Sequence, residues 1–162
     1  MTASGTVRTA TERRLIDKIA LLPGFDTSPS SNAVWWVTSP ITGQAQNDRL
    51  VVIGTYVGEF IPEGMAAGAN PQMDEWTIEC GIGLLGFDDT LEAKQEAEDA
   101  YNMIADMIAA DARLSLAGED DVGVQQVTTA RMDGPTASFD DNGTPLVFIE
   151  FAVSAAAVIH RN

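Results

Sequence analysis

The chain has 162 residues, a length that suits one domain with a substantial core, so we predict a single domain over 1–162. Its 24 Asp and Glu against 9 Lys and Arg give a net charge of −15, which repels nucleic acid and excludes a general DNA-binding protein. One cysteine excludes an internal disulfide and a multi-cysteine metal site. The N-terminal residues are not of the signal-peptide type and the apolar runs are strand-sized, so we expect a protein kept in the cytosol without membrane contact.

Apolar residues at helical spacing predict a first helix over 10–22, preceded by a flexible N-terminus at 1–9. A short strand rich in aromatic and β-branched residues is predicted over 33–37. Trp35 and Trp36 fall on opposite faces of this strand, which makes one indole a core residue and the other a candidate contact residue.

A second strand is predicted over 50–61, followed by a long exposed loop over 62–74 that has Pro and Gly but no apolar period. The next strand, 75–85, alternates between apolar residues and a polar or glycine face that includes Glu79. Cys80 lies on the apolar face, which favours a small core residue over a nucleophile.

Residues 81–86 of "CGIGLLGFDDTLE" have the G-x-G-x-x-G spacing of a nucleotide-binding turn and come directly before a predicted helix. However, Asp88, Asp89 and Glu92 place negative charge at that helix N-terminus and would repel phosphate. Asp89 also suits the N-cap, where it competes for the backbone N–H groups. We therefore interpret the glycines as a bent strand and a tight turn, and predict no cofactor.

The helix that starts at Asp89 has one apolar stripe and one acidic face, and it is expected to end near Arg113, whose charge suits the helix dipole. Strands follow over 121–132 and 146–159, and the last one is apolar on both faces, so both faces need a cover. The order α-β-β-β-α-β-β predicts an α+β fold, a largely antiparallel sheet of about five strands flanked by two helices.

Catalytic and metal sites find little support in the sequence. His160 is the sole histidine and stands two residues from the end, so a catalytic triad lacks a firmly held base. Residues 138–150 partly match a calcium loop, but Ile149 occupies the place of the bidentate acid, which favours a hairpin turn. We predict no enzyme, no catalytic residue and no metal.

The segments "DEWTIECGIGLLGFDDTLEAKQEAEDAYNMIADMIAADARLSLAG" (74–118) and "PLVFIEFAVSAAAVIHRN" (145–162) support a family resemblance. Over roughly 10–160, the order of elements resembles the tail terminator proteins of long-tailed, siphophage-type phages, which are small α+β subunits that form a ring. Basic residues gather before position 19 and acids over 88–121, a polarity that suits subunits meeting head to tail.

The resemblance implies a virion structural protein, assembled in the host cytoplasm and located at the head-proximal end of the tail. It implies a hexameric ring that caps the tail tube, ends its polymerisation and docks to the head–tail connector or stopper protein. Six copies carry 6 × (−15) = −90, so DNA passes without specific binding, and we expect acids to face the lumen.

We expect the 62–74 loop to contact a neighbouring subunit or the tube. The candidate contact residues are Arg13, Arg14, Trp35, Trp36, Met65, Met73 and Phe148. The candidate lumen or surface acids are Glu92, Glu96, Asp99, Asp120 and Asp121.

Two alternatives stay open at this point. Another neck or connector protein, or the tail-tube protein itself, has the same sheet-plus-helix architecture. A small-ligand or metal-binding enzyme that uses Glu79, Asp88 or Asp89 belongs to a different class of protein.

Overall fold

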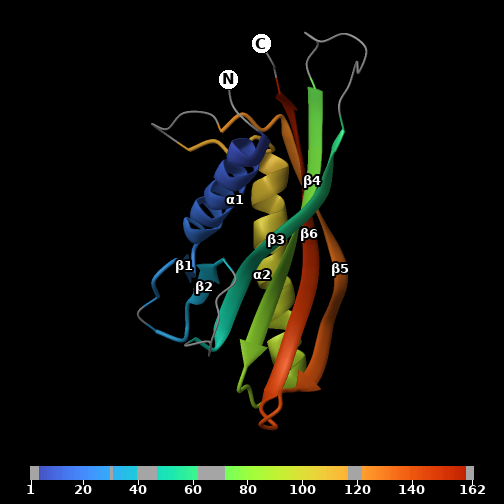
Figure 1. Ribbon diagram of the computed structural model, residues 1–162. Helices are drawn as coiled ribbons and strands as arrows, with labels where there is room; N and C mark the ends of the chain where they lie inside the picture. The colour runs from blue at the N-terminus through green and yellow to red at the C-terminus, as the bar shows by residue number, and fades with distance from the viewer. Residues whose placement is uncertain (1–3, 30, 40–46, 62–71, 117–121, 160–162) are drawn as a thin grey trace.

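The computed structural model of the protein describes residues 4–29, 31–39, 47–61, 72–116 and 122–159. Two helices and six strands follow one another along the chain (Figure 1). In chain order they are α1 (Ser4–Ala20), β1 (Phe25–Asp26), β2 (Trp35–Thr38), β3 (Arg49–Ile61), β4 (Gln72–Leu85), α2 (Thr90–Ala110), β5 (Gln126–Phe139) and β6 (Pro145–Ile159). The predicted α+β class is confirmed.

The strands form one mixed sheet in the order β1-β2-β3-β4-β6-β5. The four long strands β3, β4, β6 and β5 pair antiparallel, whereas β2 pairs parallel with β1 on one side and with β3 on the other. The strand that the sequence did not predict is β1, which has only two residues and therefore no periodicity to detect.

Both helices cover the same face of the sheet (Figure 1). α1 packs on β1 to β4, and α2 packs on β4, β5 and β6. Between these layers the inward side chains form one hydrophobic core, in which Tyr101 of α2 meets Phe151 of β6 edge to face at 5.3 Å.

The first helix begins at Ser4, six residues before the predicted start at residue 10, so residues 4–9 of the predicted N-terminal segment are helical. The helix propensity of these first residues is weak, but tertiary contacts stabilise the first turns of α1. Val7 and Arg8 are buried, the Arg8 Nε lies 3.0 Å from an Asp74 oxygen, and the guanidinium stacks 5.4 Å over the Trp76 ring.

The second helix has the predicted N-cap: the Asp89 carboxylate accepts hydrogen bonds from two backbone N–H groups of the first turn, at 3.0 and 3.2 Å. Its end differs from the prediction. The helix stops at Ala110, so Arg113 lies beyond it and the last turn has no basic residue. Lys18 of α1 supplies the missing cation, with its Nζ 2.9 Å from the carboxylate of Asp111, the C-cap residue.

Two further boundaries differ from the prediction. β4 begins at Gln72, so the end of the predicted 62–74 loop is strand, while 62–71 lies outside the described residues. β5 runs from Gln126 to Phe139, whereas the predicted strand covered 121–132, and it includes Gly134-Pro135. β5 is an edge strand with two register shifts. An edge strand tolerates proline, because a backbone N–H group on its outer side has no neighbouring strand to pair with.

Candidate interaction surface

The face of the sheet opposite the helices, which we call the open face, has no cover among the described residues (Figure 1). Alternate residues of each strand point toward it. On β6 these are apolar at five positions, Leu146, Phe148, Ala152, Ala156 and Val158. The prediction that β6 is apolar on both faces is therefore confirmed, and only one of those faces is covered within the described chain.

One cross-strand row brings two of the predicted contact residues onto the same part of the open face. Strand register pairs Trp36 with Leu50, Leu50 with Gly83, and Gly83 with Phe148. Both aromatic side chains are half-buried, and the Trp36 Nε1 donates to the Thr27 carbonyl at 3.1 Å, which holds the indole in place. Trp36 and Phe148 thus lie at the two ends of this row, with Leu50 and Gly83 between them.

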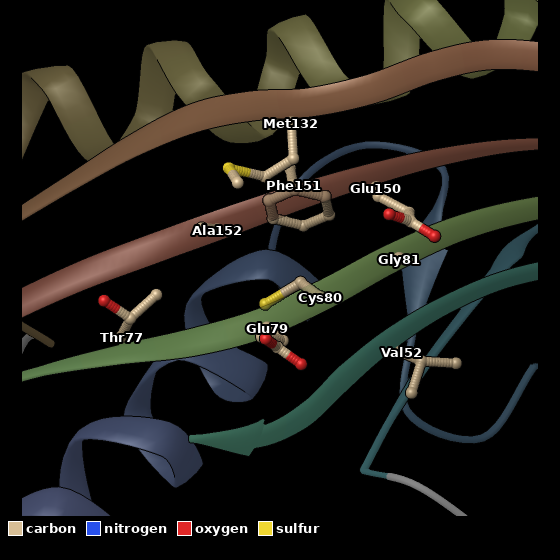
Figure 2. A pocket seen from close by; sticks show the side chains of 9 residues that line it. All are labelled: Val52, Thr77, Glu79, Cys80, Gly81, Met132, Glu150, Phe151 and Ala152. Atoms are coloured by element: carbon tan, nitrogen blue, oxygen red, sulfur yellow. The ribbon is translucent and has the colours of Figure 1, made fainter. Parts of the chain in front are cut away.

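The adjacent row contains Val52, Gly81 and Glu150 and opens into a pocket of about 460 Å³. In Figure 2 the sheet lies in front of the helices, with Met132 from β5 and Val52 from β3 at opposite sides of the pocket. The lining residues are Val52, Thr77, Glu79, Cys80, Gly81, Met132, Glu150, Phe151 and Ala152.

Among the described residues, no atom comes close enough to either of the two glycines in the middle of β4 to require a glycine there. A Cβ added at Gly81 would come no nearer than 3.7 Å to the Ile149 carbonyl oxygen, and one at Gly83 no nearer than 3.8 Å to a Leu146 methyl carbon. Both are ordinary van der Waals distances, and neither glycine has a positive φ. A glycine inside a strand weakens it and often marks the close approach of another molecule.

The G-x-G-x-x-G spacing does not form a nucleotide-binding turn. Gly81 and Gly83 lie inside an antiparallel strand, and only Gly86, with φ +69°, is in the turn before α2. The N–H groups that a phosphate would use already donate to Asp89. The predicted tight turn is confirmed at Gly86.

Two of the candidate contact residues prove to be internal, which corrects their prediction as contacts. Arg14 is 6% exposed and donates to the Leu114 carbonyl oxygen at 3.0 Å, which ties α1 to the segment after α2. Trp35 is 8% exposed and stacks on Phe25. Arg13, by contrast, is exposed on the outer side of α1.

The remaining candidates are spread over the molecule. Met73 is half-buried on the open face, but ten residues of β4 separate it from Gly83, about 30 Å of strand. Glu92 and Asp99 are exposed on α2, and Glu96 pairs with Arg49 at 2.9 Å. Met65, Asp120 and Asp121 lie outside the described residues.

The carboxylates of the alternative enzyme interpretation do not converge. Glu79 lies on the open face in mid-strand, whereas Asp88 and Asp89 follow the end of β4, about 20 Å further along the strand direction. Within the described ranges, no three His, Cys, Asp or Glu side chains are grouped so as to hold a metal ion. Burial raises the pKa of the Cys80 thiol to about 12, so this cysteine is a poor nucleophile.

Val52, Met132 and Glu150 were not predicted as parts of this surface. They lie on three different strands, and the register that brings these strands together cannot be deduced from the sequence pattern of any one of them. The two-sided apolar pattern of β6 was the one signal that indicated an uncovered face.

The fold and this surface define a class: an α+β protein whose sheet is covered by helices on one face and open on the other. Comparison with known proteins adds no family, since no protein-family model and no curated protein matches the sequence. Neither helix in the described part of the chain combines the length and the apolar character that crossing a membrane requires.

Proposed function

We propose that the protein is a structural component of a phage virion, a tail terminator whose subunits form a ring, most simply of six copies. In this role the ring caps the tail tube, ends its polymerisation and offers a docking surface to the head–tail connector. The observation that carries the proposal is the open face of the sheet, which has apolar side chains and is not covered by any described part of this chain. Such a face is typical of a surface that binds another protein.

The size of the open face suits a subunit interface. Its four long strands have 13 to 15 residues each. At about 3.3 Å per residue and about 4.8 Å between strands, they outline a face on the order of 900 Å². A stable protein interface buries about 800 Å² on each partner, so the face is large enough to hold a neighbouring subunit.

The composition of the face also supports assembly. The apolar side chains of β6 and the glycines of β4 favour close contact with a protein surface, because burial of apolar area is the main favourable term in association. The acids on the exposed side of α2 remain available to line a channel through which DNA passes, since carboxylates repel phosphates.

The first experiment measures the mass of the purified protein by light scattering over a concentration series and images the main species by negative stain. We expect single rings of about six subunits, or rings that form on the ends of purified tail tubes. Rings that stack into long tubes would instead favour the tail-tube alternative. A protein that stays monomeric both alone and with tubes would contradict the proposal.

The matched variants are Phe148→Glu, on the open face, and Phe139→Glu, an exposed phenylalanine at the end of β5. The first places a charge in the proposed interface and should abolish rings, whereas the second should leave them intact. Equal assembly of the two variants would show that the open face is not the interface.

A further inference from the structure

We infer that the pocket on the open face receives the Arg13 side chain from α1 of a second copy of this chain. Subunits then join with the helical side of one against the open face of the next. This inference rests on the proposed ring and names the contact between neighbouring subunits.

The pocket has the chemistry of a site for a long cationic side chain. Glu79 and Glu150 lie on neighbouring strands, diagonal to each other across Gly81, and both are exposed (Figure 2). Neither carboxylate makes a hydrogen bond or ion pair with the described residues. Like charges at this spacing repel, so a cation placed between them is stabilised by both.

Apart from Thr77, the rest of the pocket is apolar or lacks a side chain. Gly81 and Ala152 form its floor, and Val52 and Met132 stand at its sides. Such a surface suits the aliphatic stem of an arginine, whose guanidinium then reaches the carboxylates. Glycine at position 81 leaves this part of the floor without a side chain, although a Cβ there would make only an ordinary contact with the described residues, 3.7 Å from the Ile149 carbonyl oxygen.

This chain has few basic residues that are free to serve as the occupant. Six of the described ones are engaged: Arg8 with Asp74, Arg14 with Leu114, Lys18 with Asp111, Arg49 with Glu96, Arg131 with Glu98, and Arg113, which also has an interaction partner. Arg13 is exposed on α1 and makes no hydrogen bond or ion pair with the described residues. It is therefore the basic side chain best placed to reach another subunit.

The arrangement of the two surfaces favours a ring over a face-to-face dimer. α1 and the open face lie on opposite sides of the sheet (Figure 1), so a contact between them is heterologous and repeats from subunit to subunit. Two open faces packed against each other would instead bring Glu79 and Glu150 of both copies together, with no basic residue between them. Charge complementarity therefore selects the head-to-tail contact.

The test is a charge swap in the full chain, with association followed by analytical ultracentrifugation. Arg13→Glu and Glu150→Arg should each weaken ring formation tenfold or more, and the double variant should restore most of it. Lys94→Glu, a charge reversal of a half-buried lysine on α2, is the control and should assemble like the wild type.

A second variant separates assembly from folding. Gly81→Val should keep or raise the melting temperature, because valine suits a strand and its Cβ would make only an ordinary contact, 3.7 Å from the Ile149 carbonyl oxygen, yet it should weaken association at least tenfold. Wild-type affinity in Arg13→Glu or Gly81→Val, or no recovery in the double variant, would overturn the inference while leaving the ring itself in place. Absence of rings in the wild type, alone and with tail tubes, would overturn the proposed function and this contact together.

Discussion

Cys80 shows how the helix layer changes the chemistry of a single side chain. It lies under α1 at 8% exposure. Burial raises the pKa of its thiol to about 12, a backbone hydrogen bond with Gly54 lowers it, and the negative charges of Glu12 and Glu79 raise it further. The thiol therefore stays protonated at every pH at which the protein is handled.

We expect Cys80 in the folded protein to react with a disulfide reagent at pH 8 at least ~100-fold more slowly than in guanidinium chloride, because only the thiolate is nucleophilic. Absorbance of the released thiol measures both rates. Rapid stoichiometric labelling of the folded protein would show that the α1 layer opens readily or that the thiol is not buried.

Glu12 gives a second prediction at the same scale. Burial raises the pKa of this carboxyl above 4.5, so the folded state binds its proton more tightly than the unfolded state does. The charged form thus costs stability at neutral pH, and this cost disappears as the pH falls through the raised pKa toward 4.5.

Glu12→Gln should therefore increase the free energy of unfolding at pH 7, by less than about 1 kcal/mol after allowance for solvent screening. The gain should vanish below pH 4.5. Urea unfolding at several pH values measures it, with Asp17→Asn, an exposed carboxylate on the same helix, as the control. A decrease in stability at pH 7 would mean that the Glu12 carboxylate has a favourable partner in the folded state.

At the scale of elements, the end of α2 depends on α1. Burial raises the pKa of the Asp111 carboxyl, but hydrogen bonds from Lys18 and from the backbone N–H of Ser115 lower it more, so the net pKa lies below 3.8. A lowered carboxyl pKa contributes stability that is complete above the unfolded value and is lost as the pH falls through the folded one. This pair holds the two helices together at their C-terminal ends.

Lys18→Met should lower the free energy of unfolding by about 1 kcal/mol at pH 7, because the carboxylate of Asp111, the C-cap residue of α2, then loses its ion pair with Lys18. The deficit relative to wild type should shrink as the pH falls below 3.8. A double-mutant cycle with Asp111→Asn isolates the pair from other effects of each substitution. A deficit that does not change with pH would assign the stabilisation to packing of the lysine stem instead.

At the scale of the whole molecule, net charge opposes the proposed assembly into a ring. Each subunit carries −15, so neighbours in a ring repel each other over distances that salt can screen. Raising NaCl from about 20 mM to about 500 mM, which shortens the screening length to a few ångströms, should therefore favour rings over subunits. Sedimentation velocity measures the two populations, and rings that dissociate as salt rises would show that ion pairs outweigh the general repulsion.

Much of the fold could be predicted because it rests on local patterns. Alternation in β4 identified its buried face, and Asp89 identified the start of α2, since both signals come from residues close together in the chain. The start of α1 could not be predicted, because its first turns depend on Arg8 reaching Asp74, 66 residues away. For the same reason Arg14 looked like a surface cation but is buried against Leu114.

The sequence by itself determined the class of fold, the strong acidity and the two-sided apolar pattern of β6, because composition and periodicity are properties of the linear chain. Only the tertiary structure decided which face of the sheet the helices cover and which residues share the open face. Trp36, Gly83 and Phe148 come together through the register of four strands, and that register is set by long-range backbone pairing. The candidate surface is therefore a property of the assembled sheet, whereas the apolar pattern on both faces of β6 is already visible in one strand.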